Sequence, residues 1–89
     1  MIMMPRTRPL SLLIVDDSTV IRNRIASLVS SPQLPPIQIA GLAANGEVAL
    51  HMARETRPDL ITMDLTMPNM DGEACIEAIA SFLPDTQIL

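Results

Sequence analysis

Three aspartates in this sequence are placed where they could share one cation. Asp16 and Asp17 stand side by side directly after an apolar run, residues 10–15, and Asp64 lies in a second apolar run, residues 60–65. If these runs are neighbouring parallel strands, their carboxyl ends lie about 4.8 Å apart at one edge of a sheet. Three carboxylates in one small crevice repel one another, so either one takes a proton or a cation binds between them.

The chemistry of these ligands favours magnesium. They are hard carboxylate oxygens without His or Cys, which suits Mg²⁺, with Mn²⁺ or Ca²⁺ as alternatives. Mg²⁺ usually takes one or two carboxylates and a phosphate oxygen, so one aspartate is left for another task. An aspartate can attack phosphorus and form an aspartyl phosphate, while the metal neutralises charge on the phosphoryl oxygens. The three acids therefore predict metal-assisted phosphoryl chemistry.

Apolar patterns indicate the strands that would position these acids. The continuous apolar run over residues 10–15 predicts a strand buried on both faces, and residues 60–65 are predicted to form a third strand. The alternating stretch 37–42 predicts a weaker strand at an edge, and residues 87–89 look like the start of a fourth strand.

Helical spacing fills the three gaps between those strands. Asp17 or Ser18 is a suitable N-cap for a first helix that runs to about Ser30. Its apolar face is predicted to consist of Ile21, Ile25, Leu28 and Val29. A second helix ends near Thr56, and a third helix stops before Pro84. Strands that alternate with helices predict an α/β fold, in which helices cover both faces of a parallel sheet.

The composition limits the class of function. The chain has 89 residues, 48% of them hydrophobic, which indicates one small domain or part of one. Its formal net charge of −4 disfavours nucleic-acid binding. Single arginines such as Arg22 and Arg24 are expected to lie on the solvated surface. There is one cysteine, and no apolar stretch long enough to span a membrane. The start is interrupted by Pro5 and Pro9 and is a poor signal peptide, so we expect a cytoplasmic protein.

Three segments resemble the receiver domain of two-component response regulators. They are LLIVDDS, ANGEVAL and RPDLITMDLTMPNMDG, and the closest similarity is to receivers of the chemotaxis kind, including those of methylesterases. The resemblance covers residues 10–89. It implies a flavodoxin-like doubly wound parallel sheet with strand order 2-1-3-4, the βαβαβαβ portion of a (βα)5 receiver.

The resemblance also implies a role for each acid. Asp64 would be the phosphoryl acceptor, Asp17 would bind Mg²⁺ directly, and Asp16 would act mainly through a water on the metal. The backbone carbonyl of Thr66 would be a further metal ligand, and Pro68 and Gly72 would shape the loop over the site. The donor would be a sensor histidine kinase, a phosphotransfer protein or a small molecule such as acetyl phosphate. Such a domain is a substrate and a switch rather than a turnover enzyme.

Several residues also have simpler interpretations. Asp17 could serve only as a helix cap, and Asp71 as a turn or cap residue. Gly46 and Gly72 are expected in turn conformations. Cys75, on the apolar face of the third helix, is expected in the core rather than at a reactive site.

The sequence stops at the start of the expected fourth strand. We therefore expect residues 1–9 to be a flexible lead and residues 10–89 to be a truncated receiver. In the family, a Ser or Thr after the fourth strand and a Lys after the fifth read out the phosphoryl group, and neither position exists in this sequence. This predicts an impaired output switch, and self-association through an open strand edge and an uncovered helix.

Two other functions remain open at this stage. The chain could be a non-phosphorylated interaction or dimerisation module derived from a receiver. It could also be a Mg²⁺-dependent phosphatase with an aspartyl nucleophile, similar to haloacid-dehalogenase-like enzymes. Those enzymes have a second acid two residues after the nucleophile, and Thr66 occupies that position here.

Overall fold

Strands and helices alternate along the chain in the computed structural model, which describes residues 8–66 and 72–89. The strands within these ranges are β1 (Leu10–Val15), β2 (Ile37–Ala43), β3 (Leu60–Met63) and β4 (Gln87–Ile88). The helices are α1 (Thr19–Val29), α2 (Gly46–Thr56) and α3 (Gly72–Phe82). The predicted order of elements is confirmed, and most boundaries agree within one or two residues.

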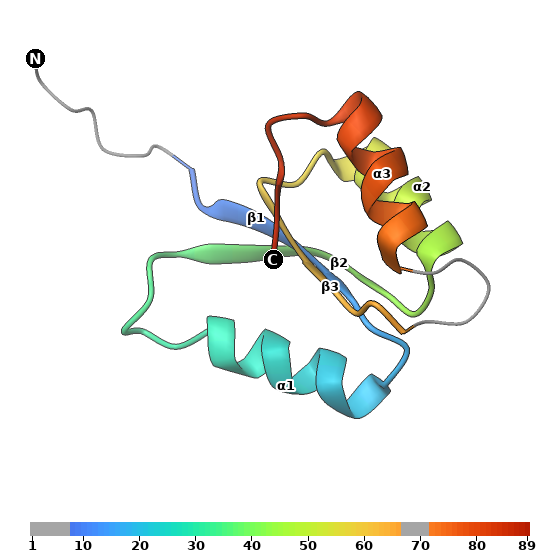
Figure 1. Cartoon of the computed structure of the whole chain (residues 1–89). Helices are drawn as coiled ribbons and strands as arrows, with labels where there is room; N and C mark the ends of the chain where they lie inside the picture. Colours follow the sequence, from blue (N-terminus) through green and yellow to red (C-terminus); the bar gives the residue numbers. More distant parts are fainter. Residues whose placement is uncertain (1–7, 67–71) are drawn as a thin grey trace, which may run out of the picture.

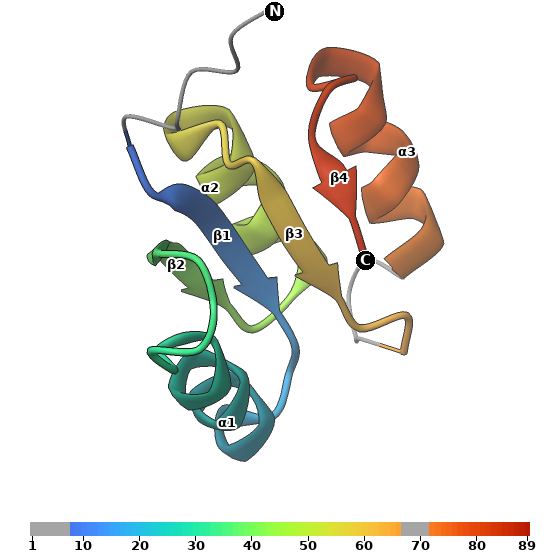
Figure 2. The same ribbon diagram turned by 90° about the vertical axis from the view of Figure 1, so that its left-hand side faces the viewer.

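The strands form one parallel sheet in the order β2-β1-β3-β4 (Figure 2). This is the flavodoxin-like order that the resemblance implies, so the predicted fold class is confirmed, and β2 lies at an edge as expected. Val15 at the end of β1 pairs with Met63 at the end of β3. Asp16 and Asp64 each come next in their chains, so the register alone brings these two acids to the same edge.

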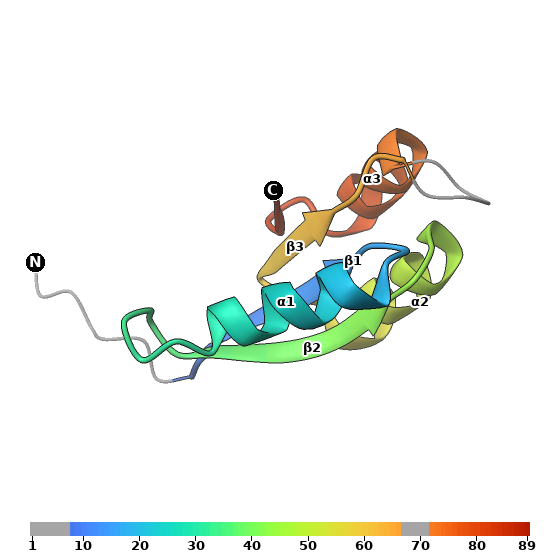
Figure 3. The same cartoon turned by 90° about the horizontal axis from the view of Figure 1, so that it is seen from below.

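Helices cover both faces of this sheet. Figures 1 and 3 show α1 on one face and α2 with α3 on the other. The main core lies between the sheet and the α2–α3 layer, and Cys75 belongs to it as predicted. Its buried members are Leu13, Val15, Ala43, Ala49, Ala53, Ile61, Cys75, Ile79 and Leu83.

The face that carries α1 is less well covered. Leu12 and Ile14 of β1 are buried beneath it, yet α1 itself contains no buried residue. On the predicted apolar face of this helix, Ile21 is 41% exposed and Leu28 is 63% exposed. The apolar periodicity therefore predicted this helix correctly, although much of its apolar face is exposed to solvent.

The two glycines expected in turns begin helices instead. Gly46 is the first residue of α2 and Gly72 is the first residue of α3, and no glycine in the described part of the chain has a positive φ. That expectation was wrong: both residues have helical backbone, and Gly72 needs a small side chain rather than an unusual backbone conformation. At Gly72, an added Cβ would lie 2.5 Å from the Cα of Leu65.

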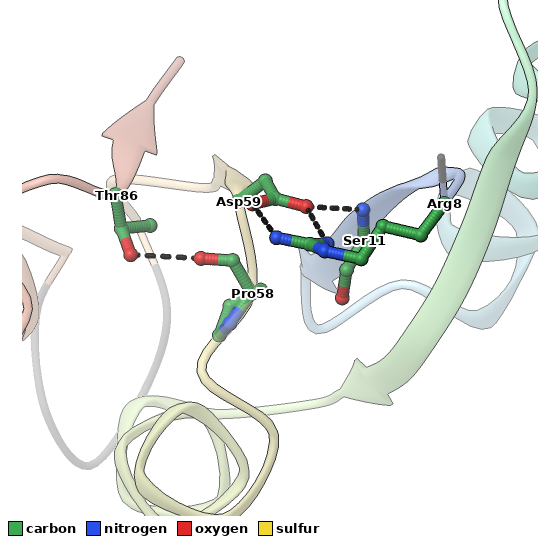
Figure 4. Close-up of polar contacts among 5 residues, drawn as sticks. All are labelled: Arg8, Ser11, Pro58, Asp59 and Thr86. Atoms are coloured by element: carbon green, nitrogen blue, oxygen red, sulfur yellow. Dashed lines mark hydrogen bonds and ion pairs between the residues drawn. The ribbon is translucent and has the colours of Figure 1, made fainter. Parts of the chain in front are cut away.

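A polar clip joins the amino-terminal ends of β1 and β3 (Figure 4). The Asp59 carboxylate accepts hydrogen bonds from the Ser11 N–H at 2.8 Å and from both terminal nitrogens of Arg8 at 2.9 and 3.2 Å. Nearby, the Thr86 hydroxyl donates to the Pro58 carbonyl at 2.8 Å. Arg8 lies within the range expected to be a flexible lead, and the boundary itself stays a prediction.

The clip yields a stability prediction. Asp59→Ala leaves the half-buried N–H of Ser11 without its acceptor, which should lower the free energy of unfolding by about 1–3 kcal/mol. Arg8→Ala should change it very little, because 63% of the Arg8 side chain is exposed and surface ion pairs are weak. Urea unfolding of the two variants measures both values, and equal losses would contradict this assignment.

Candidate metal centre

Three carboxylates meet at the carboxyl edge of the sheet. Asp16, Asp17 and Asp64 each offer one ligand atom, and these atoms all lie within 4.8 Å of one another. Asp16 and Asp64 are half-buried, whereas Asp17 is exposed. The structure thus brings together the three side chains that the sequence singled out. Two such charges at 4 Å repel by about 1 kcal/mol in water, and more strongly where protein replaces water.

The turn from β1 to α1 sets the direction of the first two acids. The N–H of Asp16 donates to the Ala43 carbonyl at 3.0 Å, and its carboxylate Oδ1 accepts the N–H of Ser18 at 2.9 Å. The hydroxyl oxygen of Ser18 accepts the N–H of Ile21 at 3.2 Å and caps α1. Ser18 is therefore the N-cap, and the simpler interpretation of Asp17 as the cap is wrong.

Asp64 is held from the other side of the site. Its N–H donates to the Val15 carbonyl at 2.9 Å. Its Oδ1 accepts two hydrogen bonds from Thr66, one from the backbone N–H at 3.0 Å and one from the hydroxyl at 2.9 Å. The backbone N–H and then the hydroxyl of Thr66 hold the pKa of Asp64 below its ordinary value. Asp64 therefore stays a carboxylate, the form that can bind a metal or attack phosphorus, to a lower pH than an ordinary aspartate.

The side chain of Thr66 is a contributor that sequence reasoning missed. Only its backbone carbonyl was assigned a role, and that role as a metal ligand stays a prediction. When a threonine follows an aspartate by two residues, the hydroxyl and the backbone N–H of the threonine can both reach the carboxylate. This spacing is a general feature of turns, so it was a weak signal.

Thr66→Val tests the electrostatic role of this hydroxyl. The variant loses one donor but keeps the backbone N–H, so the pKa of Asp64 should rise part of the way to its ordinary value. Because the pKa of Asp64 is lower in the folded protein than in the unfolded chain, its carboxylate stabilises the fold at pH values above the unfolded-state pKa. This stabilisation is lost as the pH falls through the folded-state pKa of Asp64. In Thr66→Val this stabilisation should be smaller, and its loss, which still begins at the unchanged unfolded-state pKa, should be complete at a higher pH. Titration of the Asp64 carboxyl carbon by NMR measures the shift, and an unchanged pKa would contradict it.

A hollow of about 280 Å³ lies beside the acids. It is bounded by the ends of β1 and β3, by α1 and by the last residue of the chain. The residues that line it are Val15, Asp16, Ile25, Thr62, Met63, Asp64 and Leu89. The carboxylate oxygens fit a hard divalent cation, whereas the rest of the hollow is lined mainly by apolar side chains.

Other residues that drew attention lie elsewhere. His51 is exposed on α2. Cys75 is buried with its Sγ 3.7 Å from the Gly46 carbonyl oxygen, and burial raises the pKa of its thiol. Pro68 and Asp71, expected in the loop over the site, lie outside the described residues. No helix within the described ranges is long and apolar enough to cross a membrane.

Comparison with known proteins gives a consistent result. A family model described as "Response regulator receiver domain" matches residues 12–89. A protein-glutamate methylesterase/protein-glutamine glutaminase of Nocardioides sp. is 48% identical over 67 residues, covering 75% of this chain and 18% of the relative. A similar protein of Myxococcus xanthus is 43% identical over 77 residues, covering 86% of this chain and 21% of the relative. The chain thus spans about a fifth of these curated relatives.

Solved structures with the same fold include chemotaxis proteins. The response regulator domain of Thermotoga maritima CheB is 34% identical with a TM-score of 0.82, covering 91% of this chain and 58% of that one. A chain from the CheX–CheY–BeF3–Mg²⁺ complex of Borrelia burgdorferi is 32% identical with a TM-score of 0.83, covering 90% of this chain and 59% of that one.

Proposed function

This chain belongs to the response regulator receiver domain family, and we propose that it accepts a phosphoryl group on Asp64 at a site where Asp16 and Asp17 hold Mg²⁺. The observation that carries this proposal is the approach of three carboxylate ligand atoms to within 4.8 Å of one another. In this proposal residues 10–89 are the receiver unit and residues 1–9 precede it.

The chemistry is one in-line displacement. A carboxylate oxygen of Asp64 attacks phosphorus and forms a new O–P bond, while the bond from phosphorus to the donor breaks. The donor leaves with the electron pair of that bond, as an imidazole from a phosphohistidine or as acetate from acetyl phosphate. Hydrogen bonds from Thr66 to Oδ1 hold Asp64 in the ionised form that this attack requires.

The acid pair supports the transfer by holding the cation. We propose that Asp17 binds Mg²⁺ directly, that Asp16 acts mainly through a metal-bound water, and that the Thr66 carbonyl is a further ligand. The bound Mg²⁺ would neutralise charge on the transferring phosphoryl oxygens. A solved relative that is 32% identical contains both Mg²⁺ and BeF3, which supports this assignment of chemistry.

The partner that fits this chemistry is a sensor histidine kinase or a phosphotransfer protein. The chain would be their substrate and a switch. The curated relatives are named for methylesterase and glutaminase activities, but this chain aligns with only about a fifth of their length. We therefore assign those activities to none of its residues.

A second candidate is a non-phosphorylated interaction module. Exposed apolar side chains of α1 favour it, since Leu28 is 63% exposed and Val20 is 73% exposed. In that case the chain would associate through the exposed apolar face of α1, and the aspartates would have no cation to hold.

A Mg²⁺ titration separates the two candidates. The phosphoacceptor proposal predicts saturable binding near millimolar concentration, observed by calorimetry or by NMR shifts of the Asp16, Asp17 and Asp64 amides, and reversed by EDTA. Sedimentation of the same samples reports association. Absence of Mg²⁺ binding would overturn the phosphoacceptor proposal, and a dimer in the same samples would favour the interaction module.

A further inference from the structure

Arg22 makes two hydrogen bonds beside the acid cluster. Its Nη1 donates to the backbone carbonyl of Asp16 at 2.7 Å, and its Nη2 donates to the hydroxyl of Thr19 at 3.0 Å. The residue is half-buried. The sequence predicts Arg22 on the solvated surface rather than in a binding patch; in the structure it is half-buried, and its planar fork bonds two acceptors of its own turn.

With the bond from Arg22, the backbone N–H, the backbone carbonyl and the carboxylate of Asp16 all have hydrogen-bond partners. The N–H of Asp16 is bound to the Ala43 carbonyl at 3.0 Å, and its carboxylate to the Ser18 N–H at 2.9 Å. Its carbonyl is the acceptor for Arg22. Since that carbonyl belongs to the peptide joining Asp16 to Asp17, a constraint on it also constrains where the Asp17 carboxylate points.

The same contacts join two elements across the turn. Arg22 lies in the first turns of α1, and its N–H donates to the Ser18 carbonyl at 3.0 Å. Its side chain returns to the residue that follows β1. The guanidinium therefore holds the start of the helix against the end of the strand, with the acid pair between them.

We propose that Arg22 is a positioning residue for the cation site. It fixes the Asp16–Asp17 peptide so that both carboxylates face Asp64, and it thereby raises the affinity of the site for Mg²⁺. This inference rests on the proposed function and extends it to a residue that touches neither the cation nor the phosphoryl group.

The positive charge of Arg22, taken alone, would lower the affinity of the site for Mg²⁺. A guanidinium bonded to the backbone of Asp16 repels a cation that enters the site, so removing it should tighten Mg²⁺ binding if its charge were its main contribution. If positioning dominates, removal should weaken binding. Arg22→Met removes the charge and the donors but keeps an unbranched apolar stem, so the sign of the change distinguishes the two effects.

The test compares four proteins: the unaltered chain, Arg22→Met, Arg22→Lys and Arg24→Met. Arg22→Met should weaken Mg²⁺ binding about tenfold, the usual scale for residues that orient metal ligands. Arg22→Lys keeps the charge but cannot bond both acceptors in the same geometry, so it should recover only part of the affinity. Arg24 is exposed two residues further along α1, and Arg24→Met should leave the affinity within about twofold.

A second readout needs no metal. Without Arg22 the turn should open more often, so the Ser18 amide, which is bonded to the Asp16 carboxylate, should exchange its hydrogen faster in metal-free Arg22→Met. Thr19→Val removes only one of the two acceptors and should cause a smaller change, which keeps the test usable if Arg22→Met unfolds.

The outcomes separate the two proposals. Equal or tighter Mg²⁺ binding by Arg22→Met, or unchanged exchange at Ser18, would overturn the role of Arg22. Failure of the unaltered chain to bind Mg²⁺ would instead overturn the proposed function.

Discussion

Asp64→Asn should reduce phosphoryl uptake from acetyl phosphate to background. The amide is nearly the same size as the carboxylate, and its oxygen can still accept the hydrogen bonds of Thr66, so the fold should persist. The amide has no negative oxygen to attack phosphorus, and it removes one of three charges from the cation site. Intact-mass measurement after incubation with acetyl phosphate and Mg²⁺ gives the modified fraction.

The matched control is Asp85→Asn. Asp85 is an exposed acid in the turn between α3 and β4, at the opposite end of the sheet from the cluster. The same change of carboxylate to amide there should leave uptake at the level of the unaltered chain. Substantial uptake by Asp64→Asn would reject the assignment of Asp64 as acceptor.

Gly72→Ala should both destabilise the fold and impair the site. A Cβ at Gly72 would lie 2.5 Å from the Cα of Leu65 and 2.7 Å from the carbonyl oxygen of Asp64. Both neighbours are backbone atoms, so the start of α3 or the end of β3 must move. Overpacking of this kind typically costs about 1–3 kcal/mol. Because Asp64 is one of the two residues that this Cβ would clash with, phosphoryl uptake should fall along with the free energy of unfolding.

Gly41→Ala provides the comparison. Its added Cβ would meet the sulfur of Met52 at 2.8 Å and Cδ1 of Leu13 at 3.3 Å. The closest neighbour is part of a flexible thioether side chain, which can change rotamer, so the cost should be well below that at Gly72. Urea unfolding and uptake of both variants test this difference. Equal destabilisation, or normal uptake by Gly72→Ala, would show that the close contact at α3 does not hold the site.

Much of the fold could be predicted because its signals are local. Residues 10–15 are a continuous apolar run, and residues 37–42 alternate, and these patterns indicate a central strand and an edge strand. The acid cluster followed from a simple rule, since parallel strands deliver their carboxyl ends to one edge. The pairing of Val15 with Met63 is the register that this rule needs.

The features that were missed depend on contacts between distant or oriented groups. Asp59 and Ser11 are 48 residues apart, and no periodicity indicates that the carboxylate of one binds the N–H of the other. The bond from Arg22 to the Asp16 carbonyl depends on how the turn folds back on α1. Gly72 was assigned to a turn because a glycine chosen for close packing and one chosen for its backbone conformation look alike in a sequence.

Location of the phosphoryl group by tandem mass spectrometry tests the central claim most directly. The chain is incubated with acetyl phosphate in the presence of Mg²⁺ or EDTA, and the aspartyl phosphate is reduced with borohydride to a stable product before digestion. We expect the modification on Asp64 when Mg²⁺ is present, and none in EDTA. Modification at a different residue, or equal modification of Asp64 in EDTA, would contradict a magnesium-dependent phosphoacceptor site at this edge of the sheet.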